Sequence, residues 1–260
     1  MSAAGKVYEA PHLKLKYGDI SALVVVVGDP FRTELVAKMC EHYKELAWNR
    51  EYRTFNCTYK NVQVTVCSHG IGGPGAAICF EELIKLGAKV IIRLGTCGSL
   101  KPDIISQGDL LVSIAATRED GHTAYYAPNN FPAVADPEIT LKLKEMAMKS
   151  VAENAMPDAV VTKVFTGITH TSAVFYPGPC TGDNLKQNAD AGCLGVEMEN
   201  STLFTIAAVR GIRAGSCAVV DGSPFNWEGG DYDPHGTKVN QGKKLMFQAG
   251  LDTLVALANL

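Results

Sequence analysis

The sequence lacks the long apolar stretch that a transmembrane helix requires. Its longest candidate, ALVVVV at 22–27, is far shorter than the ~20 apolar residues that span a bilayer. The N-terminal segment MSAAGKVYEAPHLKLKYG also has no apolar core of the kind found in signal peptides. We therefore expect a soluble, cytoplasmic protein.

An excess of positive charge is equally absent. Lysine and arginine number 24 against 27 aspartate and glutamate residues, which gives a net charge of −3. Proteins that bind nucleic acid need a dense basic surface for the phosphate backbone, and no basic stripe appears here. The charge balance excludes nucleic acid as the main partner and favours a small molecule.

Metal-binding and disulfide patterns are missing as well. The six histidines show no H-E-x-x-H or paired spacing. The eight cysteines are dispersed, mostly inside apolar runs, without a C-x-x-C pair or a zinc-ligand spacing. We expect free thiols in a reducing compartment and no bound metal. The cysteines are Cys40, Cys57, Cys67, Cys79, Cys97, Cys180, Cys193 and Cys217.

The sequence does contain the composition of one ordinary globular domain, residues 1–260, with 47% hydrophobic and 20% charged residues. Short apolar runs alternate with longer segments of helical period, which indicates βα units around a mostly parallel or mixed sheet. We expect strands at 22–28, 88–95, 109–116, 160–169 and 215–222, a hairpin over 50–70, and helices at 30–40, 75–86 (with Ile78, Leu83 and Leu86 inward), 137–152, 199–210 and 238–258.

The stretch HGIGGPGAAIC contains Gly70, Gly72 and Gly75 in the G-x-G-x-x-G spacing of dinucleotide-binding turns. A dinucleotide site also requires an acidic residue about twenty residues further on, which binds the ribose hydroxyls. The next strand, AKVIIRLGTCG, offers Arg93 and no carboxylate. We therefore interpret the glycines as a tight turn from a strand into a helix.

Polar residues at the ends of the predicted strands mark a candidate site, because ligands of open α/β sheets lie beyond the carboxyl ends of the strands. GDPFR follows the first strand and puts Arg32 on the opening turn of a helix, either on a solvated face or beside an anion. Arg93 lies in an apolar strand and requires an anion or a carboxylate as partner. The Thr96 hydroxyl and nearby backbone amides would suit the other oxygens of a phosphate.

Carboxylates occupy two further strand ends. Glu197 and Glu199 of VEMEN do not face the same way on a strand, so we expect separate roles, one of them a helix cap, in preference to a shared metal. Asp221 ends a very apolar strand, where it either forms a turn or is a carboxyl group of raised pKa that gives up a proton. The Gly-, Pro- and Asp-rich segment 222–236 has the composition of a mobile lid or binding loop.

Six motifs, GDPFR, NREYRTF, HGIGGPG, IIRLGTCGSL, VEMEN and VVDGSPF, occur in the order and at the spacings of the nucleoside phosphorylase-I family, which the sequence resembles over most of its length. Within that family, PHLKLKYGDISALVVVVGDP, NREYR and VVDGSPFNW look most like the hexameric purine nucleoside phosphorylases of apicomplexan parasites. The resemblance implies a three-layer α/β/α fold with a mixed, partly barrel-like twisted sheet. It also implies a homo-oligomer, a hexamer built as a trimer of dimers.

The resemblance further implies a phosphate site. Gly28, Arg32, Arg93 and Thr96 would hold phosphate, joined by Arg50 of NREYR from a neighbouring subunit. Thr96 stands where many relatives have serine, a change that keeps the hydroxyl. Phosphate would then be a co-substrate of a reaction that needs no cofactor.

The nucleoside site follows from the same resemblance. Met198 and Glu199 would meet the ribose, with the glutamate accepting hydrogen bonds from its 2′ and 3′ hydroxyls. His12 would reach the 5′-hydroxyl across a subunit boundary, and Tyr176 and Trp227 would form aromatic walls of the pocket.

Asp221 matches the acid that assists departure of the purine, so the resemblance implies reversible phosphorolysis of inosine or guanosine to the free base and ribose 1-phosphate. Uridine phosphorylases carry a glutamine and an arginine after a similar FYPG, where this chain has Pro179 and Thr181. Activity on uridine, adenosine or 5′-methylthio nucleosides stays an alternative, as does a non-catalytic nucleoside-binding protein. Hydrolytic nucleosidases share the fold, but the three arginines Arg32, Arg50 and Arg93 favour phosphate as the attacking group.

Overall fold

The structure is a computed structural model that describes residues 7–155, 162–180 and 182–258. Its helices are α1 (Pro30–Ala37), α2 (Gly73–Leu86), α3 (Pro137–Glu153), α4 (Asn184–Asp190), α5 (Asn200–Arg210) and α6 (Thr237–Ala258). Its strands are β1 (Leu23–Val27), β2 (His42–Asn49), β3 (Tyr52–Tyr59), β4 (Val62–Ser68), β5 (Val90–Ser99), β6 (Leu110–Glu119), β7 (Ala133–Val134), β8 (Val164–Ser172), β9 (Gly195–Glu197) and β10 (Arg213–Gly222).

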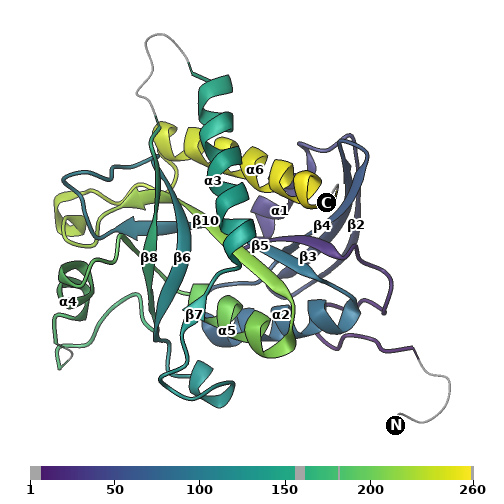
Figure 1. The fold of residues 1–260 in the computed structure, drawn as a ribbon, viewed down its shortest axis with the longest axis horizontal. Coiled ribbons are helices and arrows are strands. Elements are labelled where there is room, and N and C mark those ends of the chain that lie inside the picture. The colour runs from purple at the N-terminus through teal and green to yellow at the C-terminus, as the bar shows by residue number, and fades with distance from the viewer. Residues whose placement is uncertain (1–6, 156–161, 181, 259–260) are drawn as a thin grey trace.

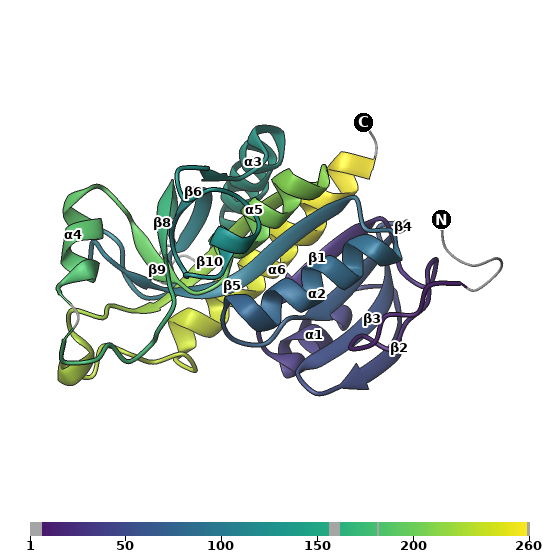
Figure 2. The same cartoon turned by 90° about the horizontal axis from the view of Figure 1, so that it is seen from below.

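The elements form three layers, with the sheet between two sets of helices (Figures 1 and 2). Along β1, Val24 and Val26 belong to the buried cluster of α2 and α5, whereas Val25 and Val27 belong to the cluster of α1, α3 and α6. Successive side chains of a strand point to opposite faces, so four consecutive valines fit only a strand that is covered on both sides. The predicted α/β fold is confirmed.

The sheet is partly closed into a barrel. β5 pairs in parallel with both β1 and β10, and β10 continues through β6, β8 and β9 back to the end of β5. Strands β1, β4, β3 and β2 extend from β5 as an open sheet, and the short β7 pairs with β6. Since β5 belongs to both parts, the residues near its carboxyl end lie where the barrel and the open sheet meet.

Three local predictions were wrong. The edge strand β2 was missed because HYKELAWN is mostly exposed and has no β-branched residue. α1 ends at Ala37 and not at residue 40, since the chain turns there to enter β2. On α2, Ile78 is 37% exposed, while Cys79 and Phe80 are fully buried beside Leu83.

No described helix is both long and apolar enough to cross a membrane. At 22 residues α6 has sufficient length, but Lys243 and Asp252 lie on its buried face. These side chains mark α6 as part of a protein core with internal polar contacts.

The close packing of α6 on the strand that leads into the candidate site is testable. A Cβ at Gly242 would lie 2.5 Å from Val219 Cγ2 and 2.6 Å from the Gly108 carbonyl oxygen. Gly242→Ala should therefore lower the free energy of unfolding in urea by about 1–3 kcal/mol, although alanine favours helix. Lys244→Ala, exposed on the same helix, is the control and should change it by less than about 0.5 kcal/mol. Equal values for the two variants would contradict this packing.

Candidate active site

Three parallel strands end side by side and bring together residues predicted from separate motifs. β1, β5 and β10 are neighbours in that part of the sheet. Gly28 directly follows β1, Thr96 lies in β5 opposite Val219, and Asp221 lies two positions further along β10. The arrangement agrees with the rule that strand ends form ligand sites in α/β proteins.

Asp221 is a buried carboxyl group at an irregular point of its strand. Between Val220 and Gly222, β10 gains one residue relative to β5, and Asp221 is that extra residue. Asp221 is only 5% exposed. Burial raises the pKa of its carboxyl group from 3.8 to about 6, although the hydrogen bond from Thr96 and the charge of Arg32 act to lower it. This favours the proton-donor alternative over a simple turn former.

Arg32 supplies positive charge close to Asp221. It lies on the first turn of α1, where burial lowers the pKa of its guanidinium and the charges of Asp29 and Asp221 raise it. Its Nε is 4.0 Å from Asp29 Oδ2, which is long for an ion pair. A largely buried cation with such weak compensation is suited to bind an anion.

Arg93 is the most buried of the predicted arginines, at 3% exposure in β5. Its Nη2 contacts Glu199 Oε2, and its Nη1 lies 3.7 Å from Glu197 Oε2. Within the described residues its Nε finds no hydrogen-bond partner. The guanidinium lies over Gly95, where a Cβ would be 2.4 Å from Nη1. The sequence predicted either an anion or a carboxylate as the partner of Arg93. The structure contains the carboxylate and leaves the Nε donor for a further acceptor.

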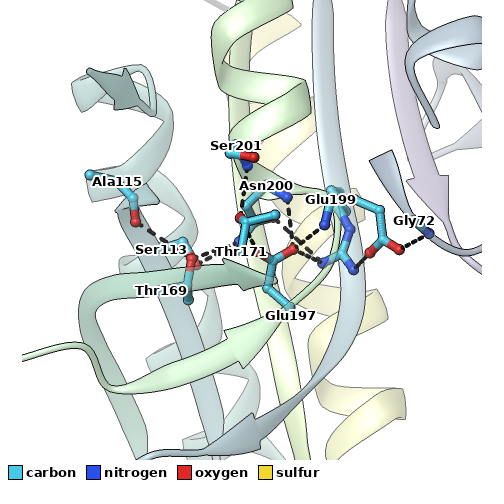
Figure 3. A network of polar contacts seen from close by, with 10 residues as sticks. Gly72, Ser113, Ala115, Thr169, Thr171, Glu197, Glu199, Asn200 and Ser201 are labelled. Atoms are coloured by element: carbon cyan, nitrogen blue, oxygen red, sulfur yellow. Dashed lines mark hydrogen bonds and ion pairs between the residues drawn. The ribbon is translucent and has the colours of Figure 1, made fainter. Parts of the chain in front are cut away.

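Glu197 caps α5. Its Oε2 accepts hydrogen bonds from the backbone amides of Glu199 (2.8 Å) and Asn200 (2.7 Å), and its Oε1 accepts one from Thr171 Oγ1 (Figure 3). Burial raises the pKa of Glu197. It therefore has the structural role that was expected for one of the two glutamates, which leaves Glu199 for a ligand.

Glu199 is held at both carboxylate oxygens. Oε1 accepts a hydrogen bond from the Gly72 amide at 2.6 Å (Figure 3), and Oε2 contacts Arg93. Burial acts to raise the pKa of Glu199, but the charge of Arg93 and the Gly72 hydrogen bond outweigh it, so the pKa is lowered. An ionised carboxylate in a fixed orientation can accept hydrogen bonds from sugar hydroxyls.

Aromatic rings gather near Asp221. Trp227 stacks on Phe175 with 4.7 Å between ring centroids, and Tyr232 lies 5.2 Å from Trp227. Tyr176 meets Phe175 edge-on but is 84% exposed, so Phe175, which the motif reading missed, makes the contact with Trp227. Burial raises the pKa of Tyr232, and the charge of Asp221 adds to the effect, so this group adjoins the acid.

The C-terminal part of the segment 222–236 is held in place by hydrogen bonds. The Asp233 amide donates to the Asp221 carbonyl at 3.0 Å, Gln107 Nε2 donates to the Asp231 carbonyl at 2.9 Å, and Lys243 Nζ donates to the Pro234 carbonyl. These contacts connect Asp231 to Pro234 with the sheet and α6. The predicted movement of the segment 222–236 as a lid stays a prediction.

His12 and Arg50 lie apart from this cluster. His12 Nδ1 is 2.6 Å from Glu82 Oε1 on α2, and its carbonyl accepts a hydrogen bond from Asn49 Nδ2. Arg50 is exposed at the turn between β2 and β3, with a left-handed φ of 55°. Asn49 thus connects the two segments, and neither residue has a recorded contact with Asp221 in the described part of the chain.

Beside His12 is a cavity of about 410 Å³. Glu82, His122 and Tyr126 contribute to its lining, which includes none of the strand-end residues Arg32, Arg93 and Asp221. The cavity therefore belongs to the surface that presents His12 and not to the strand-end cluster.

The remaining expectations concern metals, Met198 and Thr181. No group of three His, Cys, Asp or Glu side chains in the described residues could hold a metal ion. Met198 is half-buried between the two glutamates, and Thr181 lies outside the described residues.

Taken together, the site offers two arginines for an anion, a fixed carboxylate for hydroxyls and a carboxyl group that can carry a proton.

The buried carboxyl group predicts a pH-dependent gain in stability on substitution. Because the pKa of Asp221 is raised in the folded state, its burial costs little below pH 4, and the cost grows until the pH passes about 6. Asp221→Asn should raise the free energy of unfolding by up to about 3 kcal/mol at pH 8 and by less at pH 5. Urea titrations at both pH values measure this difference.

A control of opposite sign is Asp120, whose pKa is lowered in spite of burial by hydrogen bonds from His122, Ser201 and Thr123. Asp120→Asn should destabilise the protein at neutral pH and do so less in acid. If Asp221→Asn were instead destabilising at pH 8, the raised pKa of Asp221 would be contradicted.

Comparisons with known proteins identify the family of the chain. A sequence profile described as the phosphorylase superfamily matches residues 22–256. Over 222 residues the chain is 40% identical to a purine nucleoside phosphorylase of Plasmodium falciparum, covering 85% of this chain and 86% of the relative. It is also 37% identical over 223 residues to the uridine phosphorylase of Escherichia coli, covering 80% and 84%.

A solved structure is similar as a whole. The crystal structure of purine nucleoside phosphorylase from Toxoplasma gondii in complex with immucillin-H superposes with a TM-score of 0.89 at 40% identity, covering 99% of each chain. The non-catalytic alternative is thereby removed, because the family profile and the similar proteins named above are those of phosphorylases. As its motifs predict, the chain belongs to the phosphorylase superfamily, and it is a nucleoside phosphorylase of the pentosyltransferase class.

Proposed function

We propose that the protein catalyses the reversible phosphorolysis of inosine and guanosine to the free purine and α-D-ribose 1-phosphate. The observation that carries the proposal is Asp221, a carboxyl group buried at a strand end beside Arg32, with a pKa raised to about 6. A purine leaves with negative charge that spreads to N7, and a proton-carrying acid in a water-poor site can neutralise it.

Phosphate is assigned to the two arginines at the same strand ends. Arg32 has one weak ion pair, and Arg93 Nε has no hydrogen-bond partner in the described structure. Gly28 directly follows β1, and Thr96 lies in the neighbouring strand β5. As the bond between C1′ and N9 breaks, its electron pair goes to the purine, and a phosphate oxygen forms the new bond to C1′. Two arginines hold this anionic nucleophile against a ribosyl group of cationic character. These residues need no metal or organic cofactor for either step.

Glu199 is assigned to the ribose. Both of its oxygens already have a donor, the Gly72 amide and Arg93, so the carboxylate keeps its orientation without a ligand. Remaining lone pairs can accept the 2′ and 3′ hydroxyls, with Met198 against the sugar. Trp227 and Tyr176 are proposed to cover the base, with Phe175 and Tyr232 supporting Trp227.

Arg50 and His12 are assigned to the site of a neighbouring subunit in a homo-oligomer, with a hexamer as the proposed assembly. In the described part of one chain neither residue contacts Asp221, and Asn49 fixes the His12 segment beside the Arg50 turn. A single contact with a second subunit would therefore place both residues in that subunit's active site. A closed symmetric dimer contact would make the exchange mutual.

Uridine is the main alternative substrate, because a uridine phosphorylase is among the similar proteins at 37% identity. Reading a pyrimidine edge requires polar side chains, and the position after Gly178 is Pro179, which has no side-chain donor or acceptor. A protonated Asp221 can donate a hydrogen bond to the N7 of a purine. We therefore rank inosine and guanosine before uridine, adenosine and 5′-methylthio nucleosides.

Substrate assays test the proposal directly. Inosine should be converted to hypoxanthine and ribose 1-phosphate only when phosphate is present, and kcat/KM should be larger for inosine than for uridine. Chromatography of base and sugar phosphate measures both values. Release of base without phosphate would contradict phosphorolysis, and a preference for uridine would contradict the purine assignment.

Mixing two variants tests the shared site. Asp221→Ala should lower kcat by about 10²–10⁴ through loss of the proton donor, and Arg50→Ala should raise the KM for phosphate strongly. In oligomers reassembled from equal amounts of both variants, about a quarter of the sites would combine an intact Asp221 with a neighbour's intact Arg50. Activity at low phosphate should recover to roughly that fraction. No recovery above the separate variants would show that Arg50 serves its own chain.

A further inference from the structure

The glycine turn HGIGGPG is not used by the phosphate site, yet it contacts the site. The Gly72 amide donates to Glu199 Oε1 at 2.6 Å (Figure 3). Gly72 has φ 85° and ψ 157°, a backbone conformation that is essentially restricted to glycine. A regular helix start would direct this amide elsewhere, so the unusual conformation and the contact with Glu199 belong together.

A histidine from a distant loop supports the same turn. The ring of His122 lies over Gly73, where a Cβ would be only 1.9 Å from its Cε1. His122 Nδ1 is 3.1 Å from Asp120 Oδ1, and its Nε2 is 3.0 Å from Thr202 Oγ1 on the first turn of α5. The imidazole therefore packs on the start of α2 while it is bonded to the start of α5.

Asp120 strengthens this connection. Its Oδ2 accepts a hydrogen bond from Ser201 Oγ, and its Oδ1 accepts one from the Thr123 amide at 2.7 Å. Two consecutive residues of α5, Ser201 and Thr202, are thus bonded to the Asp120–His122 pair. Glu199 immediately precedes α5, so the same contacts fix the chain on which Glu199 is carried.

We propose that the turn Gly70–Gly73 is a positioning element for Glu199 in catalysis, with the Gly72 amide orienting the carboxylate and His122 holding the turn against α5. One amide of the glycine turn, that of Gly72, then does bind an anion, and this anion is the protein's own carboxylate. Phosphate would compete for Arg93, the other donor to Glu199, and the Gly72 amide keeps the carboxylate in place when that happens. This inference rests on the proposed ribose role of Glu199.

A glycine substitution with a matched control tests the turn. A Cβ at Gly72 would meet no atom within 4 Å, so Gly72→Ala acts through backbone conformation alone. We expect kcat/KM for inosine to fall at least about tenfold, the size expected when one hydrogen bond to a charged group is lost. Gly211→Ala, also at positive φ with open space and at the other end of α5, is the control and should lower it less than about twofold.

A double-mutant cycle with Glu199→Gln separates positioning from general damage. If Gly72 acts through Glu199, Gly72→Ala should lower kcat/KM at least tenfold in the wild type and less than threefold in the Glu199→Gln background. An equal loss in both backgrounds, or an equal loss for Gly211→Ala, would overturn the inference. If Glu199→Gln itself leaves kcat/KM unchanged, the proposed ribose role fails instead, and the two failures are distinguishable.

Thermal unfolding will show whether Gly72→Ala folds. His122→Ala provides a second variant for the same double-mutant cycle if it does not. It leaves the glycine backbone intact and removes the ring over Gly73. We expect a smaller loss of kcat/KM, about three- to tenfold, that again disappears in the Glu199→Gln background. A loss that persists there would mean that His122 only stabilises the fold, which would overturn its positioning role.

Discussion

The buried positive charge of Arg93 is the constraint on which the site depends. A guanidinium inside an apolar strand is costly unless it is paired, and its partners here are Glu197 at the end of β9 and Glu199 directly before α5. Glu197 is fixed by capping α5 and Glu199 by the Gly72 amide, so the ion pair joins β5, β9, α5 and the start of α2. One charge thereby determines the positions of elements that are far apart in the sequence.

The same strand ends separate two opposite electrostatic environments. Arg93 lowers the pKa of Glu199 so that the carboxylate stays ionised, whereas burial raises the pKa of Asp221, on β10, to about 6. In the proposed reaction the two carboxyl groups therefore have different roles, Glu199 as a hydrogen-bond acceptor and Asp221 as a proton donor. The two pKa values differ because the fold brings different partners close to each carboxyl group. Burying Asp221 lowers the stability of the folded protein, a cost that a purely structural residue would not have.

Much of this could be predicted from the sequence, for physical reasons that differ by residue. The four valines of β1 and the apolar run before Asp221 predicted buried strands, and the carboxyl ends of such strands predicted where a ligand site lies. The need of Arg93 for a partner was also visible, but its choice of Glu199, 106 positions away, depends on strand pairing that no local pattern contains. The roles of Gly72 and His122 were invisible for the same reason, and the exposed β2 has too few apolar residues to signal a strand. His12 and Arg50 were found only through family motifs, since their proposed partners are in another chain.

The central claim is that one edge of the sheet holds the phosphate, the ribose and the base at Arg93, Glu199 and Asp221. A crystal structure of the protein with phosphate and a non-cleavable purine nucleoside tests it most directly. The account predicts phosphate oxygens within hydrogen-bond distance of Arg32 and Arg93, ribose hydroxyls on Glu199 and the purine N7 facing Asp221. Phosphate bound elsewhere, or a base that lies away from Asp221, would contradict it.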